Sequence, residues 1–208
     1  MQDRGGPVSG TSFATLGALQ NAEARCTRCS LYEQATQVVP GEGCIGARLM
    51  LVGEQPGDKE DIAGKPFVGP AGRILDQALA EAGIARSETF VTNAVKHFKH
   101  EMRGKRRLHK RPNAYEIERC RWWVDRERAL VGPAVIVALG VTAAQSLLGR
   151  TVVIAALRGR GHALPDGTWV FVTIHLSYLL RIREEADRAR AFRAFVADLQ
   201  LAKSICEA

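Results

Sequence analysis

The sequence predicts an α/β fold: a three-layer α/β/α sandwich around a central, mostly parallel sheet of four strands. Short apolar runs alternate with stretches of helical periodicity, the pattern of βαβ units. No internal repeat or linker divides the chain, so we expect one domain over residues 11–208 behind a flexible tail at 1–10. The four expected strands are 47–53, 89–95, 134–139 and 168–174.

The helices expected between these strands follow from apolar spacing and from capping signals. The first covers 12–24 and leads into Cys26-Thr-Arg-Cys29. Asn113 and Glu116 form a capping box that predicts a helix running to about residue 131. The other expected helices are 73–82, 141–148 and about 184–203.

Charge is concentrated in one segment, which we expect to be a loop. Eight Lys or Arg and one acid lie between Lys96 and Arg111, a local charge that equals the formal +7 of the whole chain. Such a segment favours a polyanionic partner, because each neutralised phosphate releases counterions. No run approaches the ~18 to 20 apolar residues of a membrane span, and the N-terminus lacks an apolar signal core. A cytoplasmic protein with no membrane partner is therefore expected.

Polar residues lie within or just after three of the expected strands, near their carboxyl ends. Glu54 and Gln55 follow the first, Asn93 lies in the second, and His175 follows the fourth. Ligands of open α/β sheets bind outside the carboxyl ends of the strands. We therefore expect these side chains to share one site with the basic loop.

The pair Cys26 and Cys29 indicates metal or redox chemistry, since five cysteines in a reducing compartment do not favour disulfides. From spacing alone, a zinc site, an iron–sulfur site, a redox pair and two free thiols all stay open.

Several motifs together resemble the iron–sulfur (family 4) branch of the uracil-DNA glycosylases. They are Gly-Glu-Gln-Pro-Gly-Asp at 53–58, Pro-Phe-Val-Gly-Pro-Ala-Gly at 66–72, Asn93, and His175-x-Ser177. Lys-Arg-Arg-Leu-His at 105–109 resembles the loop of UdgX-type proteins within that branch. The resemblance covers Cys26 to about Arg181.

The resemblance implies roles for the residues of the site. Phe67 would stack on uracil, the amide of Asn93 would pair with its polar edge, and the backbone around Gln55 and Asp58 would close the pocket. His175 would donate a hydrogen bond to the leaving base, and Ser177 would contact a DNA phosphate. The residues implied to contact DNA are Lys105, Arg106, Lys110 and Arg181.

The UdgX-type loop implies an unusual outcome. His109 would attack the sugar carbon and leave the protein covalently joined to DNA, with Arg107 positioning it and Glu54 stabilising the sugar cation or accepting a proton. In one alternative the chain is an ordinary turnover glycosylase whose 105–109 loop only binds phosphate. In a second it is a non-catalytic, metal-stabilised nucleic-acid-binding protein.

The same resemblance implies a [4Fe-4S] cluster. Cys26, Cys29 and Cys120 match three of the family's four cysteine ligands, and His97 stands at the fourth position. Histidine ligates iron in Rieske centres, whereas tetrahedral zinc in a Cys₃His site is the alternative. Leu176 replaces the usual proline of His-Pro-Ser, from which we expect a less rigid loop. The implied partner is uracil-containing DNA, bound by a monomer.

Overall fold

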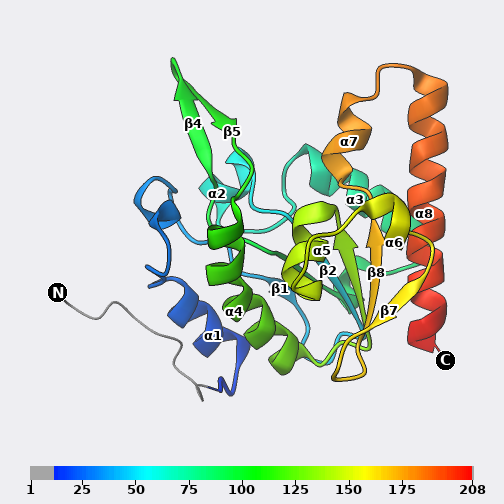
Figure 1. The fold of residues 1–208 in the computed structure, drawn as a ribbon, viewed down its shortest axis with the longest axis horizontal. Helices are drawn as coiled ribbons and strands as arrows, with labels where there is room; N and C mark the ends of the chain where they lie inside the picture. The colour runs from blue at the N-terminus through cyan, green and yellow to red at the C-terminus, as the bar shows by residue number, and fades with distance from the viewer. Residues whose placement is uncertain (1–11, 208) are drawn as a thin grey trace.

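The computed structural model describes residues 12–207, and its centre is a six-stranded sheet in the order β1-β3-β2-β6-β8-β7 (Figure 1). The inner four strands are parallel, and the two edge strands run antiparallel to their neighbours. The strands are β1 Glu42–Gly43, β2 Leu49–Gly53, β3 Thr89–Asn93, β6 Val135–Leu139, β7 Gly161–Ala163 and β8 Trp169–Thr173. The parallel four-stranded core is confirmed, and β1 and β7 extend it beyond the predicted four strands.

Helices cover both faces of this sheet, which confirms the three-layer class. One face carries α3 (Pro70–Glu81) and α8 (Glu185–Glu207), and the other carries α4 (Ala114–Val131) and α5 (Val141–Leu148). Helix α1 (Leu16–Glu23) packs on α4. The shorter helices are α2 (Asp58–Ala63), α6 (Ile154–Leu157), α7 (Leu176–Arg181), η1 (Ser30–Glu33) and η2 (Arg86–Glu88).

The inner strands are buried on both faces, as parallel strands between two helix layers must be. Every residue of β2, β3 and β6 is buried, so these short apolar runs contribute side chains to both layers of the core. Each strand then reaches its carboxyl end with a polar residue or a loop at the surface. The capping box is confirmed, since Asn113 Oδ1 accepts from the backbone N–H of Glu116 at 2.9 Å.

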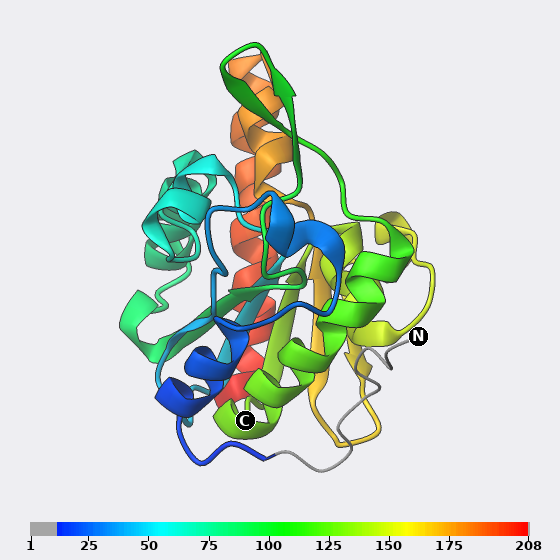
Figure 2. The same ribbon diagram turned by 90° about the vertical axis from the view of Figure 1, so that its left-hand side faces the viewer.

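The basic segment is a β-hairpin, and the expectation of a loop was wrong. Strand β4 (His100–Arg103) pairs with β5 (Arg106–His109) across a two-residue turn whose first residue, Gly104, has φ +61°. A glycine at that position is typical of type II′ turns, which match the twist of the strands. The hairpin projects beyond the carboxyl edge of the sheet, on the same side as α7 (Figures 1 and 2).

The charge of the hairpin region is lower than its composition suggests. Lys96 is fully buried, with its ammonium 2.6 Å from Glu127, so it adds nothing to the external field. Lys99 and Lys110 pair with Glu116 and Glu101. The exposed cations at the tip are Arg103, Lys105 and Arg106.

None of the helices in the described part of the chain is long and apolar enough to cross a membrane. The expected tail at 1–10 lies outside the described residues.

Candidate active site

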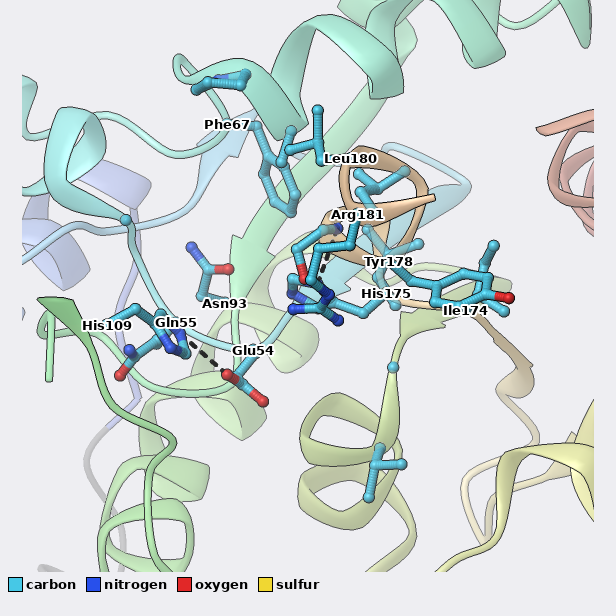
Figure 3. Close-up of a pocket in the computed structure, with 18 of the residues that line it drawn as sticks. Glu54, Gln55, Phe67, Asn93, His109, Ile174, His175, Tyr178, Leu180 and Arg181 are labelled. Atoms are coloured by element: carbon cyan, nitrogen blue, oxygen red, sulfur yellow. Dashed lines mark hydrogen bonds and ion pairs between the residues drawn. The ribbon is translucent and has the colours of Figure 1, made fainter. Parts of the chain in front are cut away.

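A cavity of about 1290 Å³ opens at the carboxyl edge of the sheet (Figure 3). Its lining includes residues that directly follow β2, one residue of β3, one of the hairpin and several of α7, and most of the predicted site lies in this lining. Its predicted members are Glu54, Gln55, Asp58, Phe67, Asn93, His109, His175, Ser177 and Arg181. The convergence predicted from the strand ends is therefore present.

Phe67 and Asn93, both labelled in Figure 3, each approach Gly53, the last residue of β2. A Cβ on Gly53 would lie 2.4 Å from Asn93 Oδ1 and 2.7 Å from Phe67 Cζ, so only glycine allows this approach. Phe67 has φ +56°, the one positive value at a non-glycine residue between 12 and 207. Such a conformation costs on the order of 1 to 3 kcal/mol and tends to occur at functional sites. A flat ring could thus stack on Phe67 while its polar edge meets the amide of Asn93.

Glu54 lies between two hydrogen-bond partners. Its Oε1 is 3.1 Å from His109 Nε2, and its Oε2 accepts the hydroxyl of Thr142 at 2.5 Å. Arg111 Nε stands 4.0 Å from the same carboxylate. Burial raises the pKa of Glu54, but the bonds from His109 and Thr142 outweigh it and hold that pKa below its usual value. Glu54 is therefore ionised at neutral pH.

His175 caps the N-terminus of α7 with its own ring. Nδ1 accepts the backbone N–H of Ser177 at 3.1 Å and lies 2.7 Å from the Ser177 hydroxyl. Because Nδ1 accepts, the neutral ring carries its proton on Nε2. Burial lowers the pKa of His175, so the ring is neutral at pH 7 and keeps Nε2–H as a donor.

Leu176 is the first residue of α7, and the lower rigidity expected from the missing proline stays a prediction. Its side chain is 1% exposed and belongs to the core beneath α7. Packing of Leu176 places the first turn of α7, which His175 caps, against the core.

Two side chains attach the hairpin to the rim of the cavity. Gln55 Nε2 donates to the carbonyls of Lys99 and Lys110 at 3.1 Å each, and Gln55 Oε1 accepts from Lys99 N at 3.1 Å. Arg107 donates to Asp58 Oδ1 at 2.7 Å and to Asp61 Oδ2 at 2.5 Å. The side chains of Gln55 and Asp58 therefore hold the hairpin, a role that the sequence did not predict for them.

An aromatic platform lies beneath His109. Phe98 is 2% exposed, its ring stacks on His100 at 5.0 Å, and its centroid is 6.3 Å from that of His109. The guanidinium of Arg107 sits 5.5 Å from the same ring. Because Arg107 and His109 both belong to β5, anchoring the former restrains the latter.

The predicted DNA-contacting residues occupy different surroundings. Lys105 and Arg106 are exposed at the tip, whereas Lys110 pairs with Glu101 at 2.8 Å. Arg181 lines the cavity at the end of α7.

Three cysteines gather in one buried cluster, and the predicted fourth ligand, His97, is buried as well. Cys26, Cys29 and Cys120 are buried in one apolar cluster with Trp123. Burial raises the pKa of the Cys29 and Cys120 thiols. His97 is 5% exposed, and its Nδ1 is buried with no hydrogen-bond partner among the described residues. A buried imidazole nitrogen in that state is suited to a metal.

No three His, Cys, Asp or Glu side chains among residues 12–207 converge closely enough to surround one metal ion. The donor set nevertheless fits iron, because thiolate and imidazole are both established iron ligands. The predicted ligands Cys26, Cys29 and Cys120 thus share one buried cluster, and His97 follows Lys96, whose backbone N–H donates to Cys120 Sγ at 3.2 Å.

The fold and the site define an α/β protein with a cavity that contains polar side chains at the carboxyl edge of its sheet, and comparison with known proteins gives the family. Residues 40–200 match the model of the uracil DNA glycosylase superfamily, to which the chain therefore belongs. The type-4 uracil-DNA glycosylase of Thermotoga maritima is 37% identical over 181 residues, which cover 86% of this chain and 88% of that protein. Type-4 uracil-DNA glycosylases of Pyrobaculum aerophilum and Sulfurisphaera tokodaii are 37% and 40% identical, over 59% and 50% of their own lengths.

Sequence reasoning missed several residues of the site. Thr142, Phe98 and Arg111 contact Glu54 or His109 but belong to no motif that we recognised. Thr142 had one available signal, since a hydroxyl in the first turn of the helix after a parallel strand lies at the ligand-binding edge.

Proposed function

We propose that this chain excises uracil from DNA and becomes covalently attached, through His109, to the abasic sugar. The observation that supports this most is the 3.1 Å approach of His109 Nε2 to Glu54 at the wall of the cavity. A histidine that only gripped phosphate would have no use for a half-buried carboxylate at its reacting nitrogen.

The attack requires a free lone pair on Nε2, which Glu54 can uncover by accepting the Nε2 proton. A protonated His109 passes its Nε2 proton to the ionised carboxylate and keeps its Nδ1 proton. Nε2 then bonds to the sugar C1′ while the bond from C1′ to uracil N1 breaks, and both electrons leave with the base. The product is an alkylated imidazolium beside Glu54, and the departing base is an anion.

His175 and Asn93 serve the leaving base. The neutral His175 ring donates Nε2–H to the uracil oxygen where charge develops, a role in which a fixed donor inside a cavity is most effective. Asn93, 3% exposed, pairs with the polar edge, and Phe67 stacks on the face. Ser177 holds the His175 tautomer through its backbone N–H.

We further propose that Cys26, Cys29, His97 and Cys120 hold a [4Fe-4S] cluster. Each iron of such a cluster takes one ligand, so the ligands need not converge on a point. The buried, unpartnered Nδ1 of His97 supports this assignment. When bound, the cluster supplies a structural brace between the segment after α1 and helix α4.

The decisive experiment is a denaturing gel of the purified protein with uracil-containing DNA. We expect a shifted band that survives heat and detergent for the native chain and no such band for His109→Ser. Lys105→Ser is the matched control, because it alters the same hairpin without touching the cavity, and it should still form the adduct.

Other outcomes discriminate between the alternatives. Abasic DNA without a shifted band would make this an ordinary turnover glycosylase. Intact DNA in every lane would contradict both enzymatic readings. Iron and sulfide contents, measured beside zinc, test the cluster separately, and His97→Ala should lower the iron content.

A further inference from the structure

The indole of Trp123 on α4 is hydrogen bonded to a cysteine that we assign to the cluster. Its Nε1–H donates to Cys26 Sγ at 3.0 Å, and the side chain is 5% exposed. A second donor reaches this group of sulfurs, because the backbone N–H of Lys96 lies 3.2 Å from Cys120 Sγ. Sulfur is a weak acceptor as a neutral thiol and a stronger one as an iron-bound thiolate.

Packing fixes the direction of the Trp123 N–H. Trp122 meets the ring edge-on, with centroids 4.6 Å apart at 81°, and Phe13 lies 6.4 Å away. Trp122 is itself bracketed by Arg28 and Arg126, each 4.9 Å from its centroid. These contacts hold the Trp123 ring on two sides, with its N–H directed at Cys26.

We propose that Trp123 is a tuning residue that raises the reduction potential of the iron–sulfur cluster. This inference rests on the cluster assignment made under Proposed function. A hydrogen bond to a ligand sulfur draws electron density away from it. The reduced cluster carries one more electron than the oxidised one, so the N–H stabilises the reduced state more.

The test compares native protein with Trp123→Phe in potentiometric titrations under anaerobic conditions, followed by visible absorbance and electron paramagnetic resonance. Phenylalanine keeps an aromatic ring in the space but lacks the N–H. At a fixed potential near the native midpoint, we expect the ratio of reduced to oxidised cluster to fall three- to tenfold. A tenfold fall is a shift of about 59 mV for one electron.

Trp169→Phe is the matched control. It removes an indole N–H from an exposed tryptophan on β8, outside the cysteine cluster, and leaves the donor to Cys26 and its packing in place, so its potential should stay close to the native value. Equal shifts in the two variants, or no shift in Trp123→Phe at full iron content, would overturn the inference.

An isosteric replacement keeps the test valid if Trp123→Phe does not assemble its cluster. Protein grown with 5-fluorotryptophan has a more acidic indole N–H, so its cluster should have a more positive potential than that of the unlabelled protein. An unchanged potential would contradict the role of the N–H. Native protein that contains zinc or no iron would instead overturn the cluster assignment itself, which metal analysis detects before any titration.

Discussion

The hydroxyl of Thr142 donates to Oε2 of Glu54 at 2.5 Å, which leaves Oε1 directed at His109. Thr142 is 1% exposed and lies in the first turn of α5. One buried hydroxyl therefore decides which carboxylate oxygen meets the proposed nucleophile.

Replacing Thr142 with valine should shift the acid limb of adduct formation to higher pH. Burial raises the pKa of Glu54, and the hydrogen bond from Thr142 is one of the interactions that lower it. Valine removes that bond, so the pKa of Glu54 should rise, although His109, His175 and Arg111 still face the carboxylate. A hydrogen bond to a charged group is worth roughly 1.5 to 3 kcal/mol, so we expect a shift of about one pH unit or more. Single-turnover rates from pH 4 to 8 measure it, and Thr142→Ser should behave like the native chain. Identical acid limbs in all three proteins would remove Thr142 from this role.

Glu23→Gln should change how stability depends on pH. Burial, followed by repulsion from Glu127, raises the pKa of Glu23 to about 8, and neither carboxylate oxygen has a hydrogen-bond partner among the described residues. The folded chain therefore holds a proton that the unfolded chain releases above about pH 4.5. The native free energy of unfolding should fall as pH rises from about 4.5 to 8, by at most about 1.4 kcal/mol per unit.

The glutamine variant should lack this fall and gain stability relative to the native chain as the pH rises. Urea unfolding at pH 5, 6.5 and 8 measures the difference, with the exposed Glu33→Gln as control. Parallel stability curves for the native and Glu23→Gln chains would show that Glu23 is ionised in the fold.

Lys96→Met should destabilise the fold strongly. Lys96 and Glu127 are 0% and 1% exposed, and the change leaves the Glu127 carboxylate buried without its cation. Breaking a buried pair in this way costs about 3 to 5 kcal/mol. Lys96→Met combined with Glu127→Gln should be less destabilised than Lys96→Met alone, because glutamine keeps an acceptor for the Gly41 N–H that Glu127 binds at 2.9 Å. A double variant that is weaker than the single one would contradict this account.

Arg106→Gln should weaken binding to uracil-free DNA and make it less dependent on salt. Arg106 is exposed beside the hairpin turn, and loss of one phosphate contact lowers the slope of log K against log salt by about 1. Fluorescence anisotropy between 50 and 200 mM salt measures the slope. Arg190→Gln on α8 is the control and should keep the native slope. Equal slopes for all three proteins would show that the hairpin tip makes no contact with DNA phosphate.

The sequence was sufficient for the parallel core and for its functional edge. Apolar runs ending in Gly53 and Asn93 mark strands that are buried on both faces, and their order along the chain brings Glu54, Asn93 and His175 to one edge. Local pattern carried this information because helices on both sides of a sheet require strands of this kind.

The rest depends on contacts between residues distant in sequence. Lys96 looked like part of a solvated basic segment because its partner, Glu127, is 31 residues away in α4. The hairpin was hidden because charged residues on both of its strands obscure the alternation, and only Gly104 indicated the turn. The edge strands β1 and β7 have two and three residues, too few to show a period.

The three hydrogen bonds of Gln55 make it a mechanical joint. The Gln55 side chain binds the backbone at both ends of the hairpin, at Lys99 and Lys110, and Gln55 directly follows Glu54 in the chain. The position of the hairpin is therefore coupled to the end of β2, at the residue next to the Glu54 carboxylate.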